Sequence, residues 1–243
     1  MNIRKHIPNF ITCLSLLSGC AAVVTALDGY IRVAMICIMA AAVFDFLDGL
    51  FARLLHAYSA IGKELDSLSD MVAFGLAPAM IIFFVLGEAS PALHLGAANA
   101  FVPFLAFVIP VFSALRLAKF NVDTRQTDSF IGLPVPAHAL LWSSLGYALQ
   151  PLVQVNEVMF ALLTVLSVAL TSWLLVSEIP MFSLKTRSLG WKGNEIRYIL
   201  LGGSAGFIVF FGFLGIAASI VLYIMLSVLN TICSNSKITS CHD

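Results

Sequence analysis

The sequence has few charged residues and no long polar segment. Of its 243 residues only 11% are charged while 60% are hydrophobic, and the mean hydropathy is +0.99. A composition this apolar excludes a soluble globular domain with a polar exterior. The longest polar interval, residues 121–129 (NVDTRQTDS), is a short loop. We therefore expect no separate soluble domain and treat residues 1–243 as one integral membrane domain.

Paired cysteines and an excess of either charge are also lacking. The formal net charge is zero, and we expect no nucleic-acid partner. No CxxC pair or metal-ligand spacing is present, so we interpret the five cysteines as apolar fillers or free thiols: Cys13, Cys20, Cys37, Cys233 and Cys241.

The first apolar run passes into Leu27, Asp28 and Gly29 without a clear A-x-A site, which favours a retained helix over a cleaved signal peptide.

Long apolar runs fill most of the chain. Only helices and closed barrels satisfy every backbone hydrogen bond in lipid, and continuous runs are typical of helices. The sequence therefore predicts an all-α, polytopic membrane bundle of about eight transmembrane helices. At about 20 residues per crossing, the spans fall at 9–27, 33–55, 64–87, 97–118, 135–151, 157–177, 196–212 and 214–232. Residues 196–233 are nearly uninterrupted, with Gly212 and Gly215 offering a turn, so six or seven spans are the alternative.

The basic residues predict the orientation of these spans. Placing the N-terminus inside leaves only Arg32 on the opposite side of the membrane. The cytoplasmic ends then receive Arg4, Lys5, Arg53, Lys63, Arg116, Lys119, Arg125, Lys185, Arg187, Lys192, Arg197 and Lys237. We expect a multi-pass protein of the inner (cytoplasmic) membrane, in which the connection between the second and third spans faces the cytoplasm.

Four aspartates stand within or beside the second and third spans, where each central charge costs roughly 2.5 to 3.5 kcal/mol. Residues three, four or seven apart share a helix face. Asp45 and Asp48 therefore share one face, and Asp66 and Asp70 share a face of the next helix. Because helices joined by a short connection pack side by side, the two acidic faces can converge into one site.

Carboxylate ligands without histidine or cysteine select Mg²⁺, Mn²⁺ or Ca²⁺. One or two such ions neutralise four clustered charges, and Mg²⁺ is usually shared with substrate phosphates. Small residues at Gly49, Ala52 and Gly62 leave room for a phosphate or a base, and Arg53 can donate to phosphate. Two plainer readings stand beside this one. The small residues can serve helix packing alone, and Arg53 can be an ion-pair partner of Asp45 or Asp48.

The spacing of these residues resembles the signature of the CDP-alcohol phosphatidyltransferase family. All eight fixed positions are present: Asp45, Asp48, Gly49, Ala52, Arg53, Gly62, Asp66 and Asp70. The resemblance implies that the four aspartates bind metal, that Asp70 is also the general base, and that Gly49, Ala52, Arg53 and Gly62 lie against the CDP group. It further implies that six of the helices form a core that carries the active site, and it implies a divalent cofactor, Mg²⁺ or Mn²⁺ with two ions per site, membrane-lipid contact and a homodimer.

Segments outside the signature indicate which alcohol accepts the phosphatidyl group. Residues 7–12, 116–121 (RLAKFN), 132–137 (GLPVPA) and 177–185 are similar to the bacterial, serine-using branch of the family, although Val135 replaces a small hydroxyl residue. We therefore expect transfer of the phosphatidyl group of CDP-diacylglycerol to L-serine, giving phosphatidylserine and CMP. Glycerol 3-phosphate, inositol phosphate or choline is the alternative acceptor. Our candidates for the acceptor pocket are Arg116, Lys119 and Asn121, and the simpler interpretation of the two cations is that they snorkel to the membrane interface.

Two other classes of protein compete with an enzyme. A cation or proton transporter would place polar residues along a path through the membrane, whereas the acidic residues here cluster near one face. A structural scaffold leaves the four aspartates unexplained. No Ser, Cys or His with a partner base adjoins the cluster, so we favour direct displacement over a covalent intermediate.

Overall fold

The computed structural model describes residues 6–123, 130–181, 190 and 194–239, except for the side chains of Phe130 and residues 232–239. Several residues named above lie outside the described part of the chain: Arg4, Lys5, Arg125, Lys185, Arg187, Lys192, Cys241 and the side chains of Cys233 and Lys237. The orientation expected from the basic residues therefore stays a prediction.

The described chain is almost entirely helical, which confirms the predicted all-α membrane bundle. Two-residue strands, β1 (Phe130–Ile131) and β2 (Pro180–Met181), form one short antiparallel pair. The helical elements are α1 (His6–Leu27), α2 (Ile31–Leu54), α3 (Ala60–Asp70), η2 (Met71–Leu76), α4 (Ala77–Ala89), η3 (Ser90–Leu93), η4 (Gly96–Phe107), α5 (Val108–Val122), α6 (Val135–Leu149), η5 (Gln150–Val155), α7 (Glu157–Val176), α8 (Glu195–Phe211) and α9 (Phe213–Thr239).

Every one of the eight predicted spans coincides with a helical segment. Six segments are long and apolar enough to cross a membrane: His6–Leu27, Ile31–Leu54, Ala60–Leu93, Gly96–Val122, Glu157–Val176 and Phe213–Thr231. The two others, α6 and α8, have 15 and 17 residues. The turn between α8 and α9 occurs at Gly212, whose φ of 55° is readily adopted by glycine.

The third span differs most from the prediction. It begins at Ala60, four residues earlier than predicted, because the Ser59 side chain accepts a hydrogen bond from the Gly62 amide at 3.0 Å and caps the helix. Directly after Asp70 the helix widens into the π-helical segment η2. Such segments are uncommon and occur often at functional sites.

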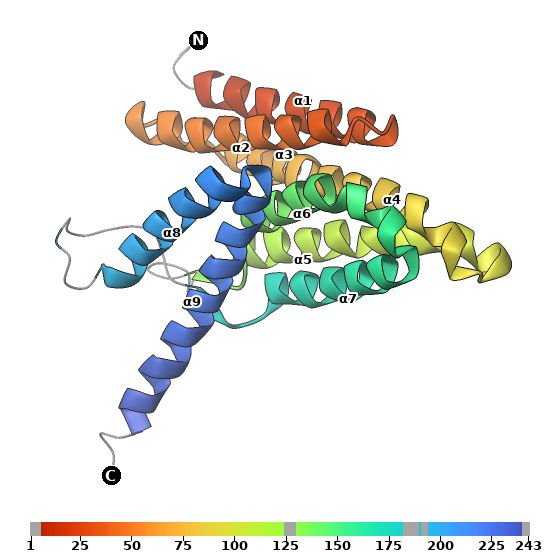
Figure 1. Ribbon diagram of the computed structural model, residues 1–243. Helices are drawn as coiled ribbons and strands as arrows, with labels where there is room; N and C mark the ends of the chain where they lie inside the picture. The colour runs from red at the N-terminus through yellow and green to blue at the C-terminus, as the bar shows by residue number, and fades with distance from the viewer. Residues whose placement is uncertain (1–5, 124–129, 182–189, 191–193, 240–243) are drawn as a thin grey trace.

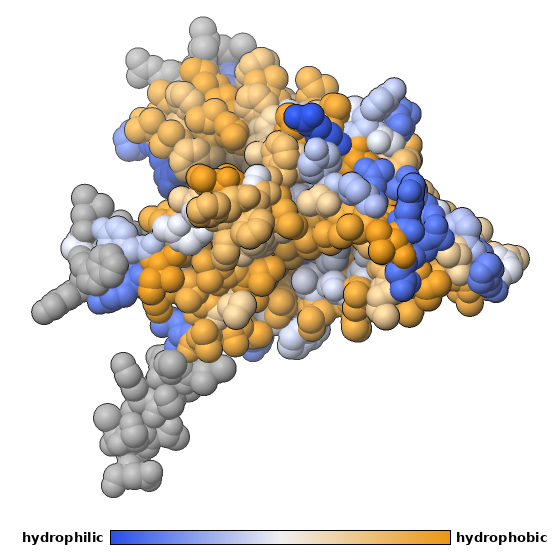
Figure 2. Space-filling view, viewed as in Figure 1, coloured by the Kyte–Doolittle hydropathy of each residue, from blue (hydrophilic) through white to orange (hydrophobic). Residues whose placement is uncertain are grey.

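Figure 1 shows α1 and α2 lying side by side along one side of the bundle, with α3 directly beneath them. Further down follow α4, α5, α6 and α7, and α9 crosses α6 with α8 packed against it. Small residues of α1 and α2 are fully buried, including Ala22, Ala26, Ala34 and Ala41, and these two helices pack closely against each other. Apolar side chains dominate the surface in Figure 2, as lipid contact requires. The fold thus brings α1, α2 and α3 together at the end where the aspartates lie.

Candidate active site

Two helices carry the four aspartates, as expected. Asp45 and Asp48 lie on α2, and Asp66 and Asp70 lie on α3. The chain between them turns at His56, which has a φ of 49°, and re-enters a helix at the Ser59 cap. This short connection turns the acidic face of α3 toward that of α2. The two helices do not pack closely side by side as predicted, because α1 packs against both of them.

Three of the carboxylates converge tightly. One oxygen each of Asp45, Asp48 and Asp66 lie within 4.8 Å of one another. Asp48 is buried, with 6% of its surface exposed, and the other two are half-buried. Three oxygen ligands so close together fit a hard divalent cation such as Mg²⁺ or Mn²⁺.

Asp70 lies outside this group of three but is linked to it. Its carboxyl group lies close enough to those of Asp45 and Asp66 for the three charges to interact. The Oδ1 atom of Asp70 is buried and has no hydrogen-bond partner. An unpartnered buried carboxylate oxygen is costly in a protein interior, so this atom is suited to receive a cation or a proton from a substrate.

A cavity of about 340 Å³ opens beside the carboxylates. Its lining includes all four residues expected to contact CDP, namely Gly49, Ala52, Arg53 and Gly62, together with Asp48 and Asp66. A Cβ atom at Gly49 would meet no atom within 4 Å, so this glycine faces open space rather than a packed helix. At Gly62, which also lines the cavity, a Cβ would lie 2.9 Å from Asn9 Oδ1, so this glycine also lets α3 approach α1 closely.

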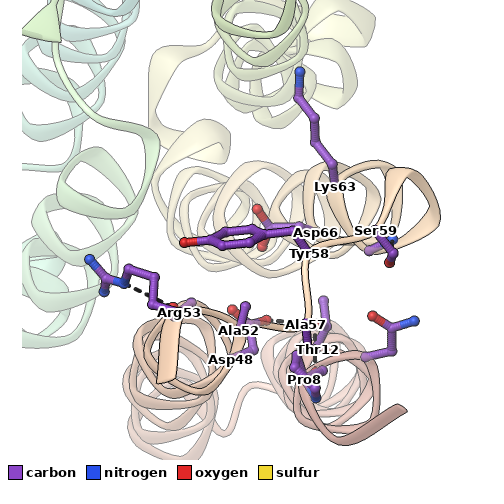
Figure 3. Close-up of a pocket in the computed structure, with 13 residues that line it drawn as sticks. Pro8, Thr12, Asp48, Ala52, Arg53, Ala57, Tyr58, Ser59, Lys63 and Asp66 are labelled. Carbon is purple, nitrogen blue, oxygen red and sulfur yellow. Dashed lines mark hydrogen bonds between the residues drawn. The ribbon is translucent and has the colours of Figure 1, made fainter. Parts of the chain in front are cut away.

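The Arg53 side chain turns back onto its own helix rather than toward the aspartates of α2. Its Nε atom donates to the Gly49 carbonyl oxygen at 3.0 Å, and its exposed guanidinium projects away from Asp48 in Figure 3. Among the described residues no ion pair joins Arg53 to Asp45 or Asp48. The remaining guanidinium donors can therefore reach a phosphate at the cavity mouth.

Other cavity residues were not assigned to the site from the sequence. They are Pro8, Asn9 and Thr12 of α1, Ala57, Tyr58 and Ser59 of the connection, and Lys63 of α3. Pro8, Asn9 and Thr12 had been noted only for their resemblance to the family. The Nζ atom of Lys63 donates to the Asn121 carbonyl at 3.3 Å. The position of Lys63 one helical turn before Asp66 could have indicated from the sequence that it lies near the site.

The three candidates for the acceptor pocket lie near the end of α5 but face different neighbours. Arg116 is buried, its Nε has no hydrogen-bond partner, and its guanidinium carbon lies 5.4 Å from the Phe120 ring centroid. Lys119 Nζ donates to the Val176 carbonyl at 3.4 Å and lies 3.7 Å from the Glu178 carboxylate. Asn121 donates to the Ser67 hydroxyl at 2.9 Å, next to Asp66.

Comparison with known proteins agrees with this geometry. The family described as CDP-alcohol phosphatidyltransferase matches residues 5–176. Relatives named CDP-diacylglycerol–serine O-phosphatidyltransferase are 38% identical over 136 residues in Helicobacter pylori J99 and 33% identical over 149 residues in Bacillus subtilis 168. An archaetidylserine synthase of Methanothermobacter thermautotrophicus is 36% identical over 143 residues.

The extent of these matches differs. They cover 55%, 61% and 57% of this chain, and 54%, 79% and 56% of the three relatives in the same order. The chain thus spans about half the length of two of these relatives. The family match itself covers the whole of α1 to α7, including all four aspartates and the cavity. This chain belongs to the CDP-alcohol phosphatidyltransferase family.

Proposed function

We propose that the chain transfers the phosphatidyl group of CDP-diacylglycerol to the hydroxyl of L-serine, giving phosphatidylserine and CMP. The observation that carries the proposal is the convergence of Asp45, Asp48 and Asp66 beside a cavity lined by Gly49 and Arg53. Carboxylates that gather a cation next to open space and an exposed guanidinium suit a diphosphate substrate. The names of the bacterial and archaeal relatives support serine as the acceptor.

The oxygen atoms of Asp45, Asp48, Asp66 and Asp70 would hold Mg²⁺ or Mn²⁺, with two ions per site. When bound, these ions neutralise the diphosphate and polarise the phosphorus under attack. The buried, unpartnered Oδ1 of Asp70 supports its place among the ligands. The all-oxygen donor set fits this cofactor and disfavours zinc.

Asp70 is proposed as the general base. As the serine hydroxyl attacks the phosphatidyl phosphorus, a new P–O bond forms, the P–O bond to CMP breaks, and the hydroxyl proton passes to the Asp70 carboxylate. Arg53 and the Gly49 surface hold the CDP group while this happens. A single displacement accounts for the reaction without a covalent enzyme intermediate.

Arg116 is proposed to bind the serine carboxylate. A buried guanidinium without a partner on Nε has donors available for a planar anion. Lys119 and Asn121 are assigned weaker roles, because each already contacts protein groups on α7 or α3. The proposal also places the site at the cytoplasmic side of an inner membrane and the active protein in a homodimer.

One assay tests the acceptor. Purified protein in detergent receives CDP-diacylglycerol and Mn²⁺ with serine, glycerol 3-phosphate, inositol phosphate or choline in separate reactions, and CMP release is measured. We expect release with serine well above the others. Faster release with another acceptor would keep the family chemistry and overturn the serine assignment.

A further inference from the structure

Thr12 of α1 makes a short contact with one of the expected metal ligands. Its hydroxyl lies 2.6 Å from Asp48 Oδ2 and 3.0 Å from the Pro8 carbonyl oxygen. One hydroxyl proton serves one acceptor at a time, and 2.6 Å is typical of a hydrogen bond to a charged carboxylate. Both side chains are buried, at 4% and 6% exposure, so water does not replace this bond. Figure 3 shows these two side chains, one from α1 and one from α2, pointing toward each other.

The backbone of Thr12 contacts the other acidic helix. Ser69, the neighbour of Asp70 on α3, donates its hydroxyl to the Thr12 carbonyl oxygen at 3.3 Å. One residue of α1 therefore holds α2 through its side chain and α3 through its main chain. These two helices carry all four aspartates.

We infer that Thr12 is a positioning residue for the metal site: its hydroxyl fixes the Asp48 carboxylate in the orientation that faces Asp45 and Asp66. The bond occupies one of about four lone-pair sites of the carboxylate and leaves the others for a cation. Hydrogen bonds to ligating carboxylates orient them, and their loss typically costs about 10- to 100-fold in metal affinity. The inference rests on the metal site of the proposed function.

Ser15 provides a matched control. It lies one turn further along α1, is buried, and donates to the Ala41 carbonyl of α2 at 3.0 Å. Ser15→Ala thus removes a buried hydrogen bond between the same two helices without touching an aspartate. Any general loosening of the α1–α2 contact will appear in this variant as well.

The test is direct binding of Mn²⁺. Metal-free wild type, Thr12→Val, Thr12→Ala, Thr12→Ser and Ser15→Ala are purified in detergent and titrated with MnCl₂, while the electron paramagnetic resonance signal of free Mn²⁺ is recorded. Thr12→Val and Thr12→Ala should weaken binding about 10- to 100-fold, whereas Thr12→Ser and Ser15→Ala should bind as the wild type does. Two hydroxyl-free variants of different size guard against misfolding of either one.

Three results would overturn the inference. Wild-type affinity in both hydroxyl-free variants would show that the bond does not orient a ligand, and equal weakening by Ser15→Ala would show only a packing effect. Absence of Mn²⁺ binding by the wild type would remove the inference together with the metal site. Wild type that binds Mn²⁺ but releases no CMP would instead remove the proposed activity and leave the role of Thr12 intact.

Discussion

Gly19 of α1 lies directly against Ala73 of η2: a Cβ atom at position 19 would stand 2.7 Å from the Ala73 Cα atom. Backbone cannot move aside as a flexible side chain can. This contact fixes the π-helical segment that directly follows Asp70. The close approach of α1 therefore bears on where the expected general base lies.

Gly19→Ala should consequently destabilise the protein, because the added methyl group pushes α1 away from η2. Overpacking of this kind costs about 1 to 3 kcal/mol, which a lower thermal-unfolding midpoint in detergent would register. Gly206→Ala is the control, since a Cβ there meets no atom within 4 Å. Equal midpoints for the two variants would contradict the packing described at Gly19.

Asp70→Asn should abolish turnover while CDP-lipid binding persists, because the amide keeps the shape of the side chain but cannot accept the serine proton. General-base removal costs about 10²- to 10⁴-fold in rate. Both kcat and binding of CDP-diacylglycerol are to be measured. Glu64→Gln removes an exposed carboxylate from the same helix and should be nearly silent. Near-normal turnover by Asp70→Asn would exclude Asp70 as the base.

Arg116→Ala should raise the KM for serine and leave the KM for CDP-diacylglycerol nearly unchanged. Hydrogen bonds to charged groups contribute about 1.5 to 3 kcal/mol, which corresponds to roughly 10- to 150-fold in KM. Arg32→Ala, at an exposed arginine far along α2 from the aspartates, serves as the control. An unchanged serine dependence would place the carboxylate elsewhere.

Variants of Asn121 and Ser67 distinguish a structural role of Asn121 from a role in binding the acceptor. If its side chain serves mainly to hold α5 against α3 through the 2.9 Å bond, Asn121→Ala and Ser67→Ala should each cost about 1 kcal/mol of stability. The double variant should then be little worse than either single one. Thermal unfolding of all three measures this coupling. Additive losses, with a raised KM for serine only in Asn121→Ala, would instead indicate an acceptor ligand.

Helical periodicity explains why much of the site was predictable. Spacings of three and four residues place Asp45 with Asp48 and Asp66 with Asp70 regardless of tertiary contacts. The short connection between α2 and α3 then brings the two faces together. The eight helical segments followed in the same way from the length of each apolar run.

Contacts between distant segments were not predictable in this way. The bond from Thr12 to Asp48 joins residues 36 apart in the sequence, and that from Asn121 to Ser67 joins residues 54 apart. Neither hydrogen bond follows from a local sequence pattern, because both depend on how α1 and α5 pack against the other helices. The π-helical segment after Asp70 likewise has no local sequence signal; it lies where α1 approaches at Gly19 and α5 at Gly75, whose added Cβ would be 3.3 Å from Ser113.

The most direct test of the central claim follows labelled serine into lipid. Purified protein is incubated with CDP-diacylglycerol and ¹⁴C-serine, with Mn²⁺ or with EDTA, and both the label in the organic extract and the CMP released are measured. The account predicts one labelled phosphatidylserine molecule for each CMP released in the presence of Mn²⁺, and no labelled lipid in EDTA. The double variant Asp66→Asn/Asp70→Asn should also give no labelled lipid. Undiminished labelling in EDTA, or no labelling at any Mn²⁺ concentration, would contradict it.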